Sequence, residues 1–246
     1  MRVGKEDAPP VEASIGMPVL QRIERAIARV VASKITVWVL IVVPGLWPLW
    51  PFFARPDPSA LADPLKFILH HLGFVACLLL VTVLTFSPLR VLFPRSPVVQ
   101  ALNRHRRLVG VSAAVYASLH FLTHVLYEGG NQLSAIPSIL HTAVTKPFQL
   151  VGLIALTILL LLAVTSLRVF VRWLGGRRWK NLHRLVYVAA PLIAYHQAAA
   201  RKVFPPQVLW IFVPLAVLEI ARIAVQRARR RKSTRQLVPQ PEAARG

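Results

Sequence analysis

The sequence predicts an all-α membrane protein, a bundle of six transmembrane helices, from three observations. Of its 246 residues, 55% are hydrophobic and 16% are charged, and the mean hydropathy of +0.55 is high for a soluble domain. The charges lie in short blocks between long uncharged stretches, so despite a net charge of +21 they form no continuous basic face for nucleic acid. Six mostly apolar stretches approach the length of about 20 residues that a bilayer core requires.

The six expected spans begin at Ile35 and end at Val225. The first contains Pro44, Pro48 and Pro51 beside three tryptophans, which predicts a kinked helix whose outer end is anchored by aromatic rings. In chain order the spans are residues 35–53, 67–86, 108–127, 148–170, 182–200 and 208–225. An even number of spans leaves both termini on the same side of the membrane.

The basic residues predict the orientation. Of the 30 Lys and Arg residues, 25 lie in the termini, in the loops after the second and fourth spans or in the span ends beside them, whereas 5 lie in loops 54–66, 128–147 and 201–207. Basic residues concentrate in cytoplasmic segments of membrane proteins, so we expect cytoplasmic termini and place these three loops outside.

Two tails flank the expected transmembrane domain of residues 35–226. Residues 1–34 form a cytoplasmic tail, in which residues 1–20 are expected to be disordered and Gln21 to Lys34 to form a basic amphipathic helix on the inner surface. Residues 227–246 form a basic cytoplasmic tail.

Histidines are the residues that could hold a cofactor, because the single cysteine, Cys77, excludes CxxC metal sites, Cys-ligated iron-sulfur clusters and covalent haem. Helices three and five are expected to run outward. At 1.5 Å per residue, His120 then lies about 18 Å above the cytoplasmic end of helix three, and His196 lies about 20 Å above that of helix five. His183 lies at the cytoplasmic end of helix five. His70, near the outer end of helix two, falls in the same layer.

Two imidazoles from facing helices commonly hold a b-type haem in a helical bundle. His120 and His196 are therefore the predicted ligands of an outer haem, with His70 as an alternative ligand or a close neighbour. His183 and His196 are thirteen residues apart and face the same side of their helix, which predicts an inner haem at His183. A structural role at the start of helix five, with Asn181 as the N-cap, is the alternative for His183.

Other interpretations stay open. The HxxxH pair His120 and His124, with the doublet 70–71, also fits a membrane di-iron enzyme, although no HxxHH box is present. A polytopic transporter or scaffold without haem is the alternative for the whole protein. His105 and His141 lie in expected loops and should be surface residues. His71 and His124 are either neighbours of a haem or residues at the lipid or solvent boundary.

Five motifs, in order along residues 35–225, resemble those of the MsrQ/YedZ family within the ferric-reductase-like superfamily. They are FSPLR at 86–90, RRLVG at 106–110, YASLH at 116–120, KPF at 146–148 and RRWKNLHRLVY at 177–187. The last motif, preceded by Thr165 and Ser166, is the most specific. The resemblance implies a membrane subunit of the bacterial inner membrane that carries b-type haem, one or two per chain, with FMN also assigned in the family.

By the same resemblance, haem ligands carry over to His120, His183 and His196, with His70 at another matching histidine. The implied role is electron transfer to a periplasmic molybdopterin-containing methionine sulfoxide reductase, with no catalytic residue in this chain. The longest outer loop, 128–147, is the expected docking surface for that subunit, and a plain connector is the alternative.

The electron donor is not fixed by the resemblance. No dinucleotide-binding glycine motif or P-loop is present, so electrons are expected from quinol or from a separate cytoplasmic flavin reductase. Arg177 and Arg178, close to His183, are candidates for holding an FMN phosphate or docking an acidic partner. The alternative is that they only determine topology.

Overall fold

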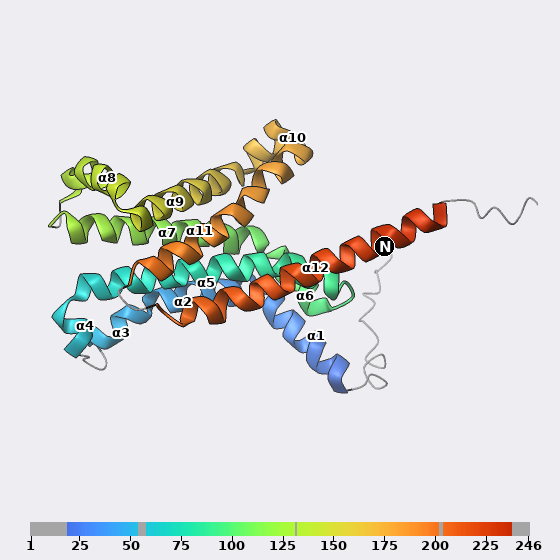
Figure 1. Ribbon diagram of the computed structural model, residues 1–246. Coiled ribbons are helices and arrows are strands. Elements are labelled where there is room, and N and C mark those ends of the chain that lie inside the picture. Colours follow the sequence, from blue (N-terminus) through green and yellow to red (C-terminus); the bar gives the residue numbers. More distant parts are fainter. Residues whose placement is uncertain (1–18, 54–57, 131, 202–203, 238–246) are drawn as a thin grey trace, which may run out of the picture.

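The computed structural model describes residues 19–53, 58–130, 132–201 and 204–237, and within these ranges the ordered elements are all helices (Figure 1). The expected all-α class is confirmed. Of the segment 1–20, expected to be disordered, residues 1–18 lie outside the described residues, and Val19 and Leu20 are helical, contrary to the expectation. Four helices are long and apolar enough to cross a bilayer, or five if a bent pair at the N-terminus counts as one span. The four are α5 (Pro64–Leu92), α7 (Arg106–Glu128), α9 (Pro147–Thr165) and α12 (Gln207–Leu237).

Helix α5 lies at the centre of the bundle, between α7 and α12 (Figure 1). Its start is well defined, because Pro64 occupies a first-turn position and the Asp63 carboxylate accepts the Lys66 backbone N–H at 3.1 Å. Its leucines, among them Leu80 at 1% exposure, share one apolar core with Ala113 of α7 and with a buried alanine of α11. Small residues at these positions let the helices approach closely.

The first expected span is broken, as its prolines predict. Helix α2 (Lys34–Leu46) passes into a 3-10 turn, η2 (Trp47–Leu49), and then into α3 (Trp50–Phe53). Pro48 has no N–H to donate to the carbonyl four residues earlier, so a regular α-helix cannot continue through this point. The rings of Trp47 and Trp50 stack with centroids 6.3 Å apart and are both largely exposed.

The basic amphipathic helix expected at the N-terminus is present as α1 (Val19–Ala32), bent by 70° from the segment that follows it. It packs against α6 (Pro97–Arg104), a short helix between α5 and α7. The Ser96 hydroxyl donates to the Glu24 carboxylate at 2.6 Å and ties the two helices together.

The fifth expected span, residues 182–200, differs from the prediction. Helix α11 (Val186–Ala199) has only 14 residues, and a 3-10 turn, η4 (His183–Leu185), separates it from α10 (Arg168–Leu182). Helix α10 is itself broken at Gly175, whose φ of 71° is a conformation that glycine adopts readily. On its own, α11 is therefore shorter than the length of about 20 residues that crosses a bilayer without tilt or thinning.

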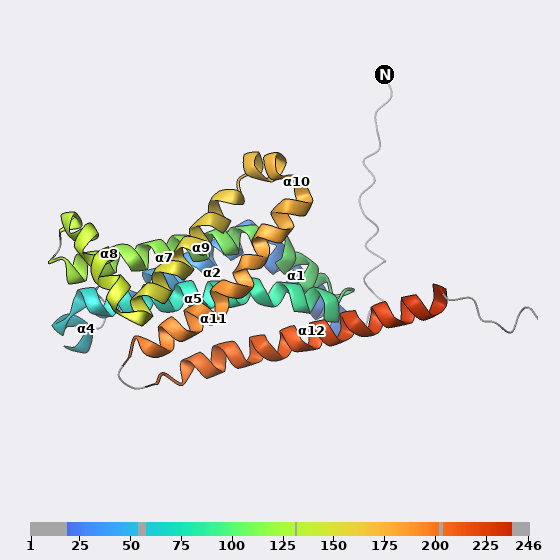
Figure 2. The same ribbon diagram turned by 45° about the horizontal axis from the view of Figure 1, so that its top comes forward.

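The remaining elements divide between two ends of the bundle. In Figure 1, α3, α4 (Pro58–Ala62) and α8 (Ile136–Thr145) gather at one end, and α1, α6, α10 and the C-terminal part of α12 lie toward the other. Figure 2 shows the same division, with the C-terminal end of α11 on the side of α4 and α8. The loops expected outside thus share one end. The loop 128–147 contains η3 (Leu133–Ala135) and α8, which packs against α9.

Candidate functional site

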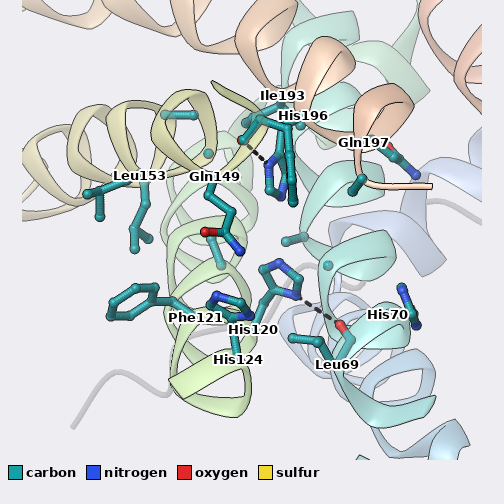
Figure 3. A pocket seen from close by; sticks show the side chains of 18 of the residues that line it. Leu69, His70, His120, Phe121, His124, Gln149, Leu153, Ile193, His196 and Gln197 are labelled. Carbon is teal, nitrogen blue, oxygen red and sulfur yellow. Dashed lines mark hydrogen bonds between the residues drawn. The ribbon is translucent and has the colours of Figure 1, made fainter. Parts of the chain in front are cut away.

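A cavity of about 320 Å³ lies between α5, α7, α9 and α11 and is lined mainly by apolar side chains (Figure 3). Two residues of α8, Ile139 and Ala143, also contribute to its wall. Four histidines line it: His70 from α5, His120 and His124 from α7, and His196 from α11. The structure therefore brings together the three histidines that were expected at one depth, His70, His120 and His196.

The rings of His120 and His196 approach each other most closely. Their centroids are 6.1 Å apart and their planes are inclined by 79°. A metal bonded to one nitrogen of each ring has bonds of about 2 Å. Adding about 1 Å from each nitrogen to its ring centre puts the two centroids about 6 Å apart, so the observed separation suits a single ion between them.

Each of these rings has one nitrogen bound to a backbone carbonyl of another helix. His120 Nδ1 lies 2.8 Å from the Leu69 oxygen on α5, and His196 Nδ1 lies 2.8 Å from the Phe148 oxygen on α9. A carbonyl only accepts, so each Nδ1 carries the proton and each Nε2 keeps its lone pair. In Figure 3 the ring nitrogens without dashed lines face each other. Two histidines that were to hold a haem iron would need this donor set and this tautomer.

The other histidines of this layer are placed differently. His70 is exposed and lies at the edge of the cavity, while His124 is half-buried one helical turn beyond His120. His71 Nε2 donates to the Pro44 carbonyl of α2 at 2.6 Å, which gives it a structural role in joining α2 to α5. His71 therefore contacts the first span and does not line the cavity.

His183 does not line this cavity. It lies in η4, where its Nε2 is 3.2 Å from the Ser166 hydroxyl and its ring centroid is 4.0 Å from that of Trp179. The Trp179 indole N–H donates to the Thr165 carbonyl at 3.0 Å. Thr165 and Ser166, at the end of α9, thus bind Trp179 and His183 and hold the turn that precedes α11 in place. His183 Nδ1 is buried and has no hydrogen-bond partner among the described residues. Asn181 lies inside α10 and does not serve as an N-cap.

A second buried polar group lies near η4. The Arg222 guanidinium of α12 is 2.6 Å from the Glu219 carboxylate and lies 5.4 Å from the centroid of the Tyr187 ring of α11. By contrast, Arg177 and Arg178 are exposed on α10, after its break. They belong to the same end of the bundle as His183 but not to the histidine cavity.

One expectation about the loop histidines is wrong. His105, expected at the surface, is only 9% exposed, and its Nε2 donates to the Ala32 carbonyl at the end of α1 at 3.1 Å. Packing of α1 against α6 covers it, and this contact between distant segments is not visible in the sequence. His141 is exposed on α8, as expected.

The donor set favours a haem over a multi-ligand metal site. In the part of the chain that the structure describes, no group of three or more His, Cys, Asp or Glu side chains could hold a metal ion. A di-iron centre needs such a group, whereas a haem brings four nitrogen ligands of its own and requires two from the protein.

Several residues at the cavity have no signature in the sequence. The Leu69 and Phe148 carbonyls act through the backbone, so no residue type marks them, although Phe148 belongs to the KPF motif. Lys66 and Arg201, both basic, also line the cavity. Both belong to the five basic residues in the loops expected outside. This location is the one feature of the sequence from which their place at the cavity could have been predicted.

Comparisons with known proteins identify the family of the chain. Residues 72–194, which contain His120 and His183, match the family described as the ferric reductase like transmembrane component. The chain is 34% identical over 196 residues, 80% of this chain and 85% of the relative, to the protein-methionine-sulfoxide reductase heme-binding subunit MsrQ of Brucella anthropi. It is likewise 34% identical over 206 residues, 84% of this chain and 89% of the relative, to MsrQ of Brucella ovis. The chain belongs to the MsrQ family and contains a ferric-reductase-like transmembrane domain.

Proposed function

We propose that this chain is the haem-binding membrane subunit of a methionine sulfoxide reductase system and transfers electrons without a substrate-reducing site of its own. The observation that carries the proposal is the pair His120 and His196, with centroids 6.1 Å apart and both Nδ1 atoms bound to carbonyls. Bound there, a b-type haem supplies a one-electron iron couple. The names of the Brucella relatives support the same cofactor.

The protein's own groups have distinct tasks at this site. The Leu69 and Phe148 carbonyls fix the tautomer and orientation of the two imidazoles, and their hydrogen bonds raise the basicity of Nε2. The apolar lining excludes water, which keeps electrons from side reactions. Lys66 and Arg201 are the proposed partners of the haem carboxylates, since both line the cavity and carry the opposite charge.

We place the protein in the bacterial inner membrane with six crossings and both termini in the cytoplasm. The segment α2 to α3 is the first crossing, and η4 with α11 is the fifth. The distribution of the 30 basic residues supports this orientation, because 25 of them lie in the termini, in the loops after the second and fourth spans or in the span ends beside them. The gathering of α3, α4 and α8 at one end supports the alternation of loops (Figure 1).

Electrons are proposed to enter at the end that carries α10. The donor is quinol or a cytoplasmic flavin reductase. His183, with its unpartnered Nδ1, is a candidate ligand for an inner haem or a residue beside FMN. Arg177 and Arg178, exposed on α10, are candidates for holding the FMN phosphate or for docking the donor.

Electrons are proposed to leave at the opposite end. The acceptor is a periplasmic molybdopterin-containing methionine sulfoxide reductase subunit, which docks on the loop that contains α8. Ile139 and Ala143 of α8 line the cavity, so a protein bound to this helix comes close to His120 and His196. Short distances favour fast electron transfer.

The optical spectrum tests the cofactor. Purified wild-type protein, made with ample haem, should show a Soret band and sharp α and β bands on reduction with dithionite. His120→Ala and His196→Ala should each lose most of this haem, because the iron loses an axial ligand, whereas His141→Ala, an exposed control on α8, should keep it. Colourless wild-type protein, or unchanged haem content in both variants, would contradict the proposal.

Two further variants assign the remaining histidines. His70→Ala should retain the haem if His70 is only a neighbour, and loss of haem would make it a ligand. His183→Ala should halve the haem content if a second haem binds at the inner end. Unchanged haem content and midpoint potentials would mean that His183 has only a structural role, through its contacts with Ser166 and Trp179.

Reoxidation tests the direction of electron flow. Reduced protein in oriented membranes should be reoxidised when the molybdopterin subunit and methionine sulfoxide are added on the side of α8. Methionine sulfoxide alone should leave it reduced. Reoxidation without the partner would reveal a catalytic site in this chain, and reoxidation only from the side of α10 would reverse the topology.

A further inference from the structure

Two glycines lie against the rings of the paired histidines, and they occupy equivalent places. A Cβ atom built on Gly73 of α5 would lie 2.9 Å from Nδ1 of His120, and one built on Gly152 of α9 would lie 2.6 Å from Nδ1 of His196. Real side chains essentially never approach a Cβ this closely. Each imidazole therefore occupies the space that any side chain other than glycine would need.

The hydrogen bonds explain why both positions need glycine. Gly73 follows Leu69 by four residues and Gly152 follows Phe148 by four, and Leu69 and Phe148 are the residues whose carbonyls bind the histidines. In an α-helix the carbonyl of residue i already accepts the N–H of residue i+4, and the side chain of i+4 covers the turn before it. Removing that side chain exposes the second lone pair of the carbonyl to a donor from another helix.

A third contact of the same kind occurs in α2. The Tyr116 hydroxyl donates to the Ile41 carbonyl at 2.8 Å, and the residue four positions later is Gly45, where a Cβ would collide with the Tyr116 ring. The same arrangement thus occurs at three carbonyls of the described helices, those of Leu69, Phe148 and Ile41, each of which lies inside a helix and binds a side chain from another helix.

Four other side chains of the described residues donate to backbone carbonyls of distant elements, and these carbonyls are already free. Those of Ala32, Thr165 and Val91 lie at or near the C-terminal ends of α1, α9 and α5. That of Pro44, which binds His71, is free because Pro48 has no N–H.

We propose that Gly73 and Gly152 are positioning residues for haem ligation, each opening the carbonyl four residues before it so that this carbonyl can hold Nδ1 of one ligand histidine. The proposal rests on the haem site between His120 and His196 proposed above. The carbonyls that the two glycines leave accessible do what a carboxylate or carbonyl beside a ligand histidine does in metal sites, where loss of this partner typically weakens metal affinity by about 10- to 100-fold.

Gly73→Ala and Gly152→Ala test this role, with two matched controls. Gly110→Ala changes a helix glycine whose Cβ would meet only Val83, at 3.8 Å. Gly45→Ala creates a collision of the same kind, but with Tyr116, away from the histidines. Each variant is purified from membranes, and its haem content, ferric electron paramagnetic resonance spectrum and midpoint potential are compared with those of the wild type.

We expect haem affinity to fall about tenfold or more in Gly73→Ala and Gly152→Ala. In the haem that remains, the midpoint potential should rise, because an imidazole without its Nδ1 hydrogen bond donates less to ferric iron. A tenfold loss of ferric over ferrous affinity corresponds to about 59 mV for a one-electron couple. Gly110→Ala and Gly45→Ala should keep wild-type haem content, resonance and potential.

The outcomes separate this inference from the haem proposal. Wild-type protein without haem would overturn the haem site itself. Haem in the wild type, with Gly73→Ala and Gly152→Ala indistinguishable from Gly110→Ala, would overturn only the role of the glycines. If one of the two variants does not accumulate in membranes, the other decides. Failure of both to accumulate while Gly45→Ala accumulates would also overturn the proposal, because the glycines would then serve folding and not ligation.

Discussion

At the scale of single residues, the ring nitrogen that makes the hydrogen bond divides the histidines into two groups. His71 and His105 use Nε2 to donate to carbonyls of other elements, whereas His120 and His196 use Nδ1 and leave Nε2 toward the cavity. An imidazole reaches farther through Nε2 than through Nδ1, so a histidine that only joins two helices can use the distal nitrogen. A ligand must keep that nitrogen free.

The angle between the paired rings predicts a magnetic signature. The planes of His120 and His196 are inclined by 79°. Nearly perpendicular imidazole planes make the dxz and dyz orbitals of ferric iron, which overlap with the π systems of the two rings, almost equal in energy, and this spreads the g values. Wild-type protein should therefore give a strongly anisotropic low-spin signal in electron paramagnetic resonance. The rhombic signal of parallel planes would mean that the rings rotate when haem binds, or that another histidine replaces one of them.

The basic residues of the cavity predict a modest electrostatic effect. Lys66→Gln and Arg201→Gln should each weaken haem retention a few-fold, because exposed charge pairs are worth roughly 1 kcal/mol or less. Titrating haem from protein with apomyoglobin at low and high salt measures the effect, which should shrink as salt rises. Lys146→Gln, at the same end but outside the cavity lining, is the control. Equal losses in all three variants would argue against a specific contact.

At the scale of elements, tertiary contacts govern the segments that depart from regular helices. The 3-10 turn η4 is held by Ser166 and by Trp179, which come from the end of α9 and from α10. Near the same end of the bundle, α1 is fixed on α6 by Glu24 and on the start of α7 by His105. These polar contacts lie away from the histidine cavity, so they can be weakened separately from it.

His105→Ala is expected to destabilise this end of the bundle by about 1–3 kcal/mol, since it removes a buried side chain that bonds to the Ala32 carbonyl. Thermal unfolding in detergent should show a lower midpoint, with an unchanged haem spectrum. His141→Ala, exposed on α8, should leave both unchanged. A lost haem spectrum with unchanged thermal stability in His105→Ala would show instead that this residue acts at the cofactor.

At the scale of the whole molecule, the two ends of the bundle carry the two proposed docking regions, α8 at one and α10 at the other (Figure 1). The one cysteine, Cys77, is 2% exposed, so a membrane-impermeant maleimide should not label the wild type. In a Cys77→Ala background, Thr142→Cys on α8 should be labelled in intact spheroplasts, and Arg177→Cys on α10 only after permeabilisation. The reverse pattern would invert the proposed topology.

The sequence by itself determined the helical class, the approximate limits of the apolar segments and the common level of His70, His120 and His196. These follow from hydropathy, charge distribution and the rise of a helix, which are properties of the chain read locally. It also predicted that the first span is kinked by its prolines, because a missing N–H is a property of one residue. The burial of His105, the shortness of α11 and the free Nε2 of the paired histidines were decided only by the tertiary structure. Each depends on which groups of a distant segment arrive beside a residue, and for His120 and His196 these groups are backbone carbonyls, which every residue has and no sequence pattern marks.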